Sequence, residues 1–184
     1  MKPPSHPKIY HITHIENLPS IINAGFLFSD EYRTVNGLKN VNIGMKNLKA
    51  RRLQKVEVAC HSGTTLGQYV PFYFCPRSVM LYVIYMSDHP ELEYRGGQKL
   101  ILHLQIDMRR AIQWAESSDV LWAFSDGHAA TKYAAFYSNT QLLNQVDWNA
   151  VAARDWREPQ IRHRKQAEFL VYERIPWGLV EKIG

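Results

Sequence analysis

The sequence of 184 residues has only two cysteines, Cys60 and Cys75, and no hydrophobic run long enough to cross a membrane. Two cysteines are too few for a disulfide scaffold and are compatible with a reducing compartment. The longest apolar run, 79–86, is far shorter than the roughly 18 residues that a transmembrane helix requires. The first residues, MKPPSHP, lack the apolar segment of a secretory signal. We therefore expect a single soluble domain over 1–184, located in the cytoplasm, with no membrane partner.

Low-complexity segments and internal repeats are also absent, and 46% of the residues are hydrophobic, which is typical of a folded domain. The net charge of +5 is concentrated in two stretches. Six Lys or Arg and one acidic residue lie in 39–57, and a second basic cluster lies in 154–165. Such clusters attract polyanions, among them nucleic acids and phosphorylated cofactors. For either cluster alone, a solvated surface is the alternative.

Strand and helix patterns mix without the regular rhythm of a doubly wound sheet, which predicts an α+β fold. Alternation over 100–106 predicts a strand, and Asp107 follows it as the N-cap of an amphipathic helix. Asn17 is the predicted N-cap of a short helix that Gly25 ends in a left-handed conformation. Further strands are predicted at 8–13, 70–74, 120–124 and 167–174, helices at 45–54, 77–86, 128–137 and after Pro176, and a long loop at 29–47.

Glu168 is the main catalytic candidate. It stands at the mouth of the apolar strand 167–174, and alternation places it on one face with Leu170. A carboxylate between core and cleft can accept a hydrogen bond or act as a general base, with a pKa that burial adjusts. The alternative is a structural ion pair with Arg164 or Lys165.

His11 and Thr13 share one face of the first predicted strand. Side by side they supply a donor and an acceptor that suit a ribose or an amide, although a structural histidine is the alternative. His11 and His14 are also candidates for a zinc site together with Cys60, His61 or Cys75. The spacing disfavours zinc, because no Cys-x-x-Cys occurs and the strand points the two histidines apart.

Three weaker candidates complete the set. The turn Ser125–His128 presents His128 after a strand, where a helix cap is the alternative. In the helix predicted at 45–54, Arg51 and Arg52 are candidate phosphate ligands; the pattern places Met45, Leu48 and Leu53 inward and Lys46, Lys49 and Arg52 outward. Candidate stacking partners for nucleic acid bases, with burial in the core as the alternative, are Tyr69, Tyr73 and Trp156.

Together, several stretches resemble the DarT-type DNA ADP-ribosyltransferases, the toxin halves of bacterial toxin–antitoxin pairs. The matching stretches are YHITHIENLP at 10–19, IGM at 43–45, LKARRL at 48–53, VPFYFCPRSVMLY at 70–82, GGQ at 96–98 and KQAEFLV at 165–171. The resemblance extends from residue 8 to Gly184, and VPFYF and QAEFLV are its most specific parts. The chain is most similar to the branch that modifies thymidine in single-stranded DNA.

This resemblance implies the ADP-ribosyltransferase fold, in which split antiparallel β-sheets and surrounding helices enclose an NAD cleft. Glu168 is the implied catalytic glutamate, and the catalytic arginine falls within the Arg51–Arg52 pair, of which Arg51 is preferred. His11 and Thr13 would hold the nicotinamide ribose and amide, and the loop at 29–47 would close over NAD. The implied cofactor-binding residues are His11, Thr13, Asn17, Gly25, Arg51 and His128, and no metal is implied.

The implied reaction transfers ADP-ribose from NAD to thymidine in single-stranded DNA and so blocks replication, and the implied partner is a macrodomain antitoxin. We expect a monomer. The chemistry suits the residues, because cleavage of the nicotinamide–ribose bond develops positive charge that a carboxylate stabilises. Two alternatives stay open: an enzyme of the same fold that modifies RNA or protein, and a non-catalytic, basic nucleic-acid-binding module in which Glu168 is structural.

Overall fold

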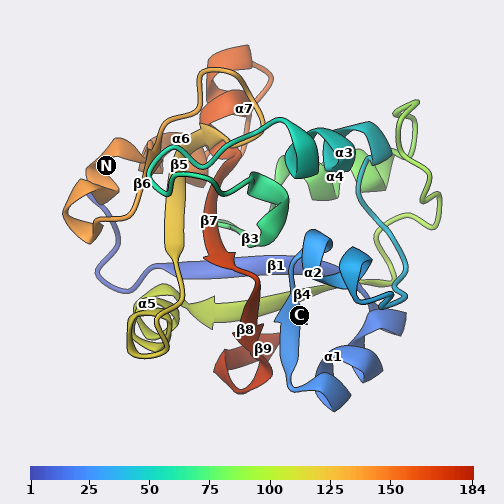
Figure 1. The fold of residues 1–184 in the computed structure, drawn as a ribbon. Coiled ribbons are helices and arrows are strands. Elements are labelled where there is room, and N and C mark those ends of the chain that lie inside the picture. The colour runs from blue at the N-terminus through green and yellow to red at the C-terminus, as the bar shows by residue number, and fades with distance from the viewer.

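The computed structural model describes all residues from 1 to 184 and contains two antiparallel sheets. Seven strands form the large sheet in the order β6–β5–β7–β3–β1–β4–β9, and β2 pairs with β8 in a small second sheet (Figure 1). The strands are β1 (Lys8–His14), β2 (Phe26–Phe28), β3 (Tyr69–Tyr73), β4 (Ile101–Asp107), β5 (Trp122–His128), β6 (Phe136–Tyr137), β7 (Ala167–Tyr172), β8 (Arg174–Pro176) and β9 (Val180–Ile183). The α+β prediction is confirmed.

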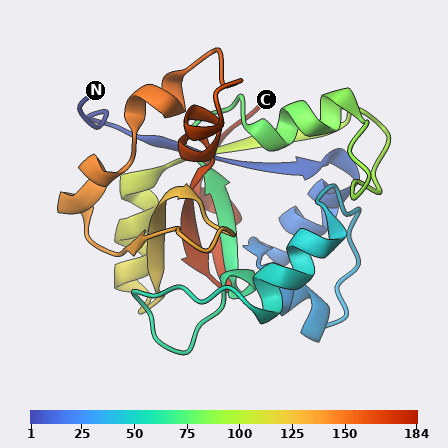
Figure 2. The same cartoon turned by 90° about the horizontal axis from the view of Figure 1, so that it is seen from above.

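Short helices surround the sheets. In both Figure 1 and Figure 2, α1, α2 and α3 gather at one side of the large sheet, and α5 and α6 lie at the other. No helix combines the length and the apolar character that a bilayer crossing needs. The helices are α1 (Leu18–Ala24), α2 (Asp30–Val35), α3 (Lys46–Gln54), α4 (Val79–Met86), α5 (Met108–Ser117), α6 (Trp148–Ala152) and α7 (Pro159–Lys165), with 3₁₀ turns η1 (Ile15–Asn17), η2 (Leu66–Gln68), η3 (Thr140–Gln145) and η4 (Trp177–Leu179).

The large sheet is split between β1 and β3. These two strands pair only at Tyr10 and Tyr73, whereas β1 and β4 stay in register from Lys8–Asp107 to His14–Ile101. Strands β5 and β7 therefore run steeply across β1 and β4 (Figure 1). Backbone groups that diverge in this way leave a cleft between the two halves, with β1 on one side of the split and β3 on the other.

The core lies between the large sheet and α5. Phe72, Phe124 and Phe169 are fully buried on the neighbouring strands β3, β5 and β7. Asp107 caps α5 by accepting hydrogen bonds from the Arg109 and Arg110 amides, which confirms its predicted role. Because Ala167–Val171 is buried on both faces, β7 is held rigidly in the middle of its half of the sheet.

Two predicted elements are wrong. The helix expected at 128–137 is absent, because β5 continues to His128 and a hairpin closes through hydrogen bonds between Asp126 and Ala135. The alanines that favour a helix there are used in packing, and Ala129 and Ala130 are buried. The loop expected at 29–47 contains α2, whose N-cap Ser29 accepts a hydrogen bond from the Tyr32 amide.

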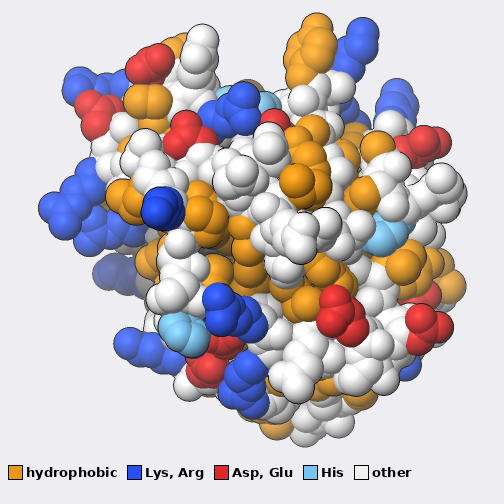
Figure 3. All heavy atoms as spheres, turned by 90° about the vertical axis from the view of Figure 1, so that its left-hand side faces the viewer, with side chains coloured by type: hydrophobic (Ala, Val, Ile, Leu, Met, Phe, Trp, Pro, Cys, Tyr) orange, Lys and Arg blue, Asp and Glu red, His pale blue; other side chains and the backbone are white.

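Positive charge is unevenly distributed on the surface. On the face that carries the N-terminus and α5, most Lys and Arg side chains gather along one edge, and hydrophobic side chains occupy much of the middle (Figure 3). This is consistent with the clustered, rather than dispersed, charge in the sequence.

Candidate active site

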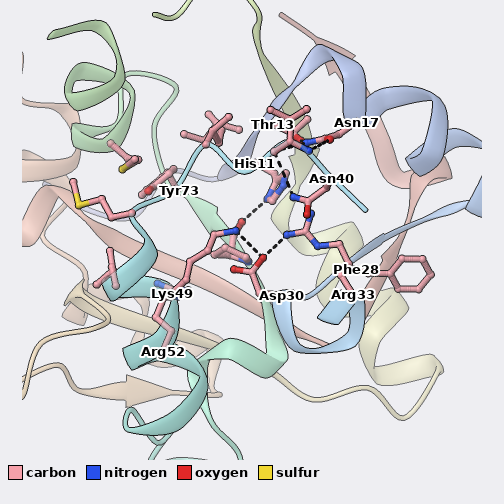
Figure 4. A pocket seen from close by; sticks show the side chains of 18 of the residues that line it. His11, Thr13, Asn17, Phe28, Asp30, Arg33, Asn40, Lys49, Arg52 and Tyr73 are labelled. Carbon is pink, nitrogen blue, oxygen red and sulfur yellow. Dashed lines mark hydrogen bonds and ion pairs between the residues drawn. The ribbon is translucent and has the colours of Figure 1, made fainter. Parts of the chain in front are cut away.

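A cavity of about 130 Å³ occupies the split between β1 and β3. One wall consists of His11 and Thr13 on β1 and Pro71 and Tyr73 on β3, and the other consists of the segment 28–49 with α3 (Figure 4). Glu168, at the start of β7, lies at one end of the cavity. Residues far apart in the sequence therefore meet here because the sheet is split.

Glu168 and Arg52 form a buried, bidentate ion pair. Arg52 Nη1 donates to Glu168 Oε1 at 3.0 Å, and Nη2 donates to Oε2 at 2.9 Å. The two side chains are only 11% and 5% exposed. A parallel, two-bond contact between a guanidinium and a carboxylate fixes the position of both groups more firmly than a single bond does. The carboxylate therefore has a defined direction at the end of the cavity.

The backbone around Glu168 is also fixed. Its amide donates to Ser125 Oγ at 3.0 Å, and Ser125 is itself fully buried on β5 and donates to the Gly127 carbonyl. Across the other neighbouring strand, Glu168 is in register with Tyr73 on β3. The catalytic candidate is thus held on one side by pairing with β3 and on the other by the Ser125 hydroxyl, at an irregularity in the pairing of β5 with β7.

Burial and the charge of Glu168 shift the pKa values of Arg52 and of the neighbouring Tyr73. Burial alone lowers the pKa of Arg52, but the adjoining Glu168 carboxylate outweighs this effect, and the net pKa of Arg52 is raised. The pKa of Tyr73 is also raised, first by burial and then by the charge of Glu168. Near pH 7 Arg52 is therefore a guanidinium, and Tyr73 beside it is a neutral phenol.

His11 presents a neutral ring to the cavity. Its Nδ1 donates to the Pro71 carbonyl at 2.9 Å, since a carbonyl can only accept. Burial lowers the pKa of His11 to about 4, so the ring is uncharged near pH 7. Nε2 is therefore left as a hydrogen-bond acceptor, which matches a sugar hydroxyl.

Hydrogen bonds of the Asn17 side chain connect the segment 28–49 to β1. Its Nδ2 donates to Thr13 Oγ1 at 3.1 Å and to the Val41 carbonyl at 3.0 Å, and its Oδ1 accepts from the Val41 amide at 2.7 Å. Both amide hydrogens are thereby used within the protein. This also explains why Asn17 stands at the N-cap of α1 without a side-chain capping bond.

An ionic network crosses the cavity between α2 and α3. Asp30 accepts hydrogen bonds from Arg33 and, at 3.0 Å, from Lys49 (Figure 4). Burial raises the pKa of Asp30, but the charges of Lys49 and Arg33 outweigh burial and hold this pKa at about 2. Arg33 Nε is buried without a hydrogen-bond partner. Two cations facing one carboxylate leave an excess positive charge inside the cleft.

A second cavity of about 180 Å³ continues on the far side of Arg33. It shares six residues with the first: His11, Thr13, Asn17, Phe28, Arg33 and Asn40. The two cavities are therefore neighbouring parts of one cleft, and side chains from the segment 28–40 stand between them.

The predicted site residues divide into two groups. Glu168, His11, Thr13 and Asn17 line the cavity together. Arg51, the preferred catalytic arginine, does not line it: it is exposed on α3, whereas its neighbour Arg52 lines the cavity. The prediction that Lys49 and Arg52 point outward is wrong, since both line the cavity.

Gly25 and His128 lie outside the cavity lining. Gly25 ends α1 with φ +73°, and its carbonyl accepts a hydrogen bond from the Trp177 amide, so its backbone serves the fold. His128 on β5 pairs with Ala167 on β7, the residue that precedes Glu168. The Nδ1 atom of His128 accepts a hydrogen bond from the Ala130 amide. Burial lowers the pKa of His128, which keeps the ring neutral beside the ion pair.

Three charged cavity residues were not predicted as part of the site: Asp30, Arg33 and Lys49. Tyr73, a predicted stacking candidate, lines the cavity as well. The helical repeat could have found Lys49, which follows the N-cap residue Met45 of α3 by four positions. The zinc alternative lacks ligands. No three His, Cys, Asp or Glu side chains come close enough together to hold a metal ion.

Comparison with known proteins decides which family this is. Residues 10–184 match the family described as "ssDNA thymidine ADP-ribosyltransferase, DarT". A DNA ADP-ribosyl transferase of Thermus sp. (strain 2.9) is 40% identical over 182 residues, which cover 98% of this chain and 82% of that protein. The chain belongs to the DarT family. The predicted family and fold are thereby confirmed. The predicted enzyme class, an NAD-dependent DNA ADP-ribosyltransferase, is confirmed as well.

Solved DarT structures agree with this. Thermus sp. 2.9 DarT in complex with ADP-ribosylated ssDNA superposes with a TM-score of 0.88 at 38% identity, covering all of this chain and 83% of that one. The same DarT in complex with NAD+ gives a TM-score of 0.80 at 37% identity, with 99% and 83% covered. A Thermosipho africanus protein described as a DNA ADP-ribosyl transferase–DNA ADP-ribosyl glycohydrolase fusion is 27% identical, over 91% of this chain and 39% of that protein.

Proposed function

We propose that the cleft binds NAD and transfers its ADP-ribose to a thymine base of single-stranded DNA, with Glu168 and Arg52 as the catalytic pair. The observation that carries this proposal is the buried, bidentate contact between these two side chains at the end of the cavity of a DarT-family chain. The roles of the individual residues follow from their contacts.

The cleft fits a dinucleotide in two parts. The two adjoining cavities measure about 130 and 180 Å³. The nicotinamide half and the adenosine half of a dinucleotide would occupy one each, with the side chains of the segment 28–40 that separate the cavities moving aside. Arg33 and Lys49 suit the diphosphate, since both are cationic and Arg33 Nε has no protein partner.

His11 and Thr13 suit the ribose and amide at the nicotinamide end. The free Nε2 of His11 accepts from a hydroxyl, and Thr13 lies beside it on β1. For Asn17, whose amide is bonded to Thr13 and Val41, we propose a positioning role that holds the segment 28–49 in place beside the ligand.

Loss of nicotinamide places positive charge on the ribose carbon, and Glu168 stabilises this charge because its carboxylate is held in a low-dielectric site. The thymine ring nitrogen then attacks that carbon and must lose its proton. Arg52 is a poor base because its pKa is raised, so it serves as the donor that stabilises charge on the thymine carbonyl oxygens. Glu168 accepts the proton, and the products are nicotinamide and ADP-ribosylated thymine.

Mass spectrometry of a thymidine-containing oligonucleotide after incubation with NAD tests the reaction. We expect a mass gain of one ADP-ribose with the native chain and with Arg51→Ala, and none with Glu168→Ala or Arg52→Ala. Modification of RNA or protein alone would favour another acceptor, and binding of DNA without consumption of NAD would favour a non-catalytic module.

We also propose that the chain is a toxin that acts as a monomer in the bacterial cytoplasm and is neutralised by a macrodomain partner that removes ADP-ribose from DNA. The support is the fusion relative, whose name joins a DNA ADP-ribosyl transferase to a DNA ADP-ribosyl glycohydrolase. Expression should stop growth of a bacterial host, and Glu168→Ala or co-expression of a DNA ADP-ribosyl glycohydrolase should restore it.

A further inference from the structure

A second groove, outside the cleft, runs between α4 and the segment 153–158. It is lined by aromatic rings that are open to solvent: Tyr82 is 47% and Tyr85 is 59% exposed. Tyr82 packs edge-on against Trp156, with ring centroids 6.0 Å apart, and Tyr85 lies 6.4 Å from Tyr82. Exposed aromatic side chains side by side are costly to leave in water, which indicates a surface that binds something flat and apolar.

The groove is also positively charged. Arg77 and Lys99 line it, both are exposed, and neither forms an ion pair. No Asp or Glu lines the groove. Cations next to aromatic faces, without a neutralising acid, form the arrangement that binds a phosphate backbone whose bases are unstacked.

Trp156 is held in place by a buried lysine. Lys165 is 2% exposed, its Nζ lies 5.1 Å from the centre of the Trp156 ring, and it donates to the Val151 carbonyl at 2.7 Å. Lys165 is the last residue of α7, three positions before Glu168. A cation over the ring fixes the ring orientation and connects the groove to the strand that carries the catalytic carboxylate.

The groove and the reaction site both use α4. Met80, on this helix, lines the cavity that contains Glu168, and Leu81 and Tyr82 line the groove. A strand of nucleic acid with its target base at Glu168 would cross α4 to reach the groove.

We propose that this groove binds the bases that flank the target thymine of the single-stranded DNA, with Tyr82, Tyr85 and Trp156 as stacking surfaces and Arg77 and Lys99 as phosphate ligands. This inference rests on the proposed function, because it takes the DNA strand as the substrate of the same site. It assigns part of the DNA affinity to residues that do not touch NAD.

DNA binding measured in the absence of NAD separates the contribution of the groove from that of the reaction. Fluorescence anisotropy would compare an oligonucleotide of about four nucleotides around one thymidine with one of about twelve, a range that single-strand binding sites cover. For Tyr82→Ala/Tyr85→Ala we expect the affinity for the longer strand to fall about tenfold or more, since each stacked base contributes substantially. Affinity for the shorter strand should not change. Tyr82→Phe/Tyr85→Phe keeps the rings and should bind both strands as the native chain does.

Salt dependence tests the cations. Arg77→Gln and Lys99→Gln should each reduce the slope of log affinity against log salt by about 0.7, the value for one phosphate contact on a single strand. Lys182→Gln, an exposed lysine on β9, is the matched control and should leave the slope unchanged. These variants, like the Phe pair, preserve the fold of α4 and so decide the question even if the Ala pair unfolds.

Different experimental outcomes would overturn the proposed function and the proposed role of the groove. If the native chain binds the longer strand but never adds ADP-ribose to it, the proposed function is overturned. If the native chain modifies the strand while the Ala and Gln variants bind it with native affinity and slope, the groove does not bind DNA and this inference is overturned. Loss of affinity for RNA alone, or for a protein partner alone, overturns it equally.

Discussion

The two walls of the cleft are built in different ways. The wall that carries Glu168 is a set of paired strands, in which β7, buried over Ala167–Val171, lies between β5 and β3. The opposite wall, residues 28–49, has backbone pairing near its two ends, where Phe28 and Ser29 join β8 and Glu173 and Met45 bridges to Leu92. Between these ends the Asn17 side chain holds Val41, and Asp30 braces the wall internally through Arg33 and Lys49. Backbone pairing fixes geometry, whereas a few polar contacts can open. We infer that the first wall positions the chemistry and the second admits the dinucleotide.

The largest loss of activity should come from a substitution in the wall that carries Glu168. Glu168→Gln retains the shape of the side chain but removes its charge, so we expect transfer to fall by about a thousandfold or more, as for other preorganised electrostatic groups. Arg52 would be left buried without a counter-charge, and the free energy of unfolding should fall by about 3 kcal/mol. Oligonucleotide modification rates and urea unfolding measure the two effects.

The control for this prediction is Glu116→Gln, an exposed glutamate on α5. It should change neither the rate nor the stability. Retention of activity in Glu168→Gln would show that the charge on this side chain is not needed and would contradict the catalytic assignment.

The next effect separates two adjacent arginines. Arg52→Ala removes both hydrogen bonds to Glu168 and should reduce transfer at least about a hundredfold. Arg51→Ala, a substitution of an exposed residue one position away, should change the rate by no more than about twofold. Single-turnover rates at saturating NAD measure the chemical step. Equal losses in the two variants would place the catalytic role on the charge of α3 as a whole.

This pair also shows what sequence can and cannot predict here. The residue types at Glu168, His11 and Thr13 and the alternation of β1 and β7 predict which faces they occupy, because strand period is local. The face of α3 was misjudged because its polar residues Lys49 and Arg52 point inward, to partners on α2 and β7 that no local pattern reveals. The hairpin after His128 was missed for a similar reason: its alanines favour a helix, and only the contacts of Asp126 with Ala135 decide otherwise.

A smaller effect is expected in the opposite wall of the cleft, residues 28–49. Asn17→Ala removes three hydrogen bonds, among them both contacts to Val41, and should raise the KM for NAD about thirtyfold, at roughly 1 kcal/mol for each of the two Val41 bonds. The kcat should change much less, because Glu168 and Arg52 are untouched. Initial rates over a range of NAD concentrations separate the two parameters. Asn36→Ala, an exposed asparagine at the end of α2, is the matched control, and a fall in kcat alone would assign Asn17 to the chemistry instead.

The smallest effect is a pH dependence of stability that originates in the same wall. Asp30 has a pKa of about 2 in the folded chain, below its ordinary value of 3.8, because Lys49 and Arg33 outweigh its burial. A carboxyl whose folded pKa is lowered stabilises the fold above its unfolded pKa, and this contribution is lost as pH falls from about 4 to about 2. The difference corresponds to about 2 kcal/mol at pH 5.

Asp30→Asn should therefore be less stable than the native chain at pH 5 by about this amount, and the difference should shrink as the pH approaches 2. Urea unfolding at several pH values measures the difference, and Glu16→Gln, an exposed carboxyl in η1, corrects for general acid effects. Because the network also crosses the path that the dinucleotide takes, loosening it should lower the barrier to NAD entry. A difference that stays constant from pH 5 to pH 2 would mean that Lys49 and Arg33 do not hold Asp30 ionised, and that this network does not brace the second wall.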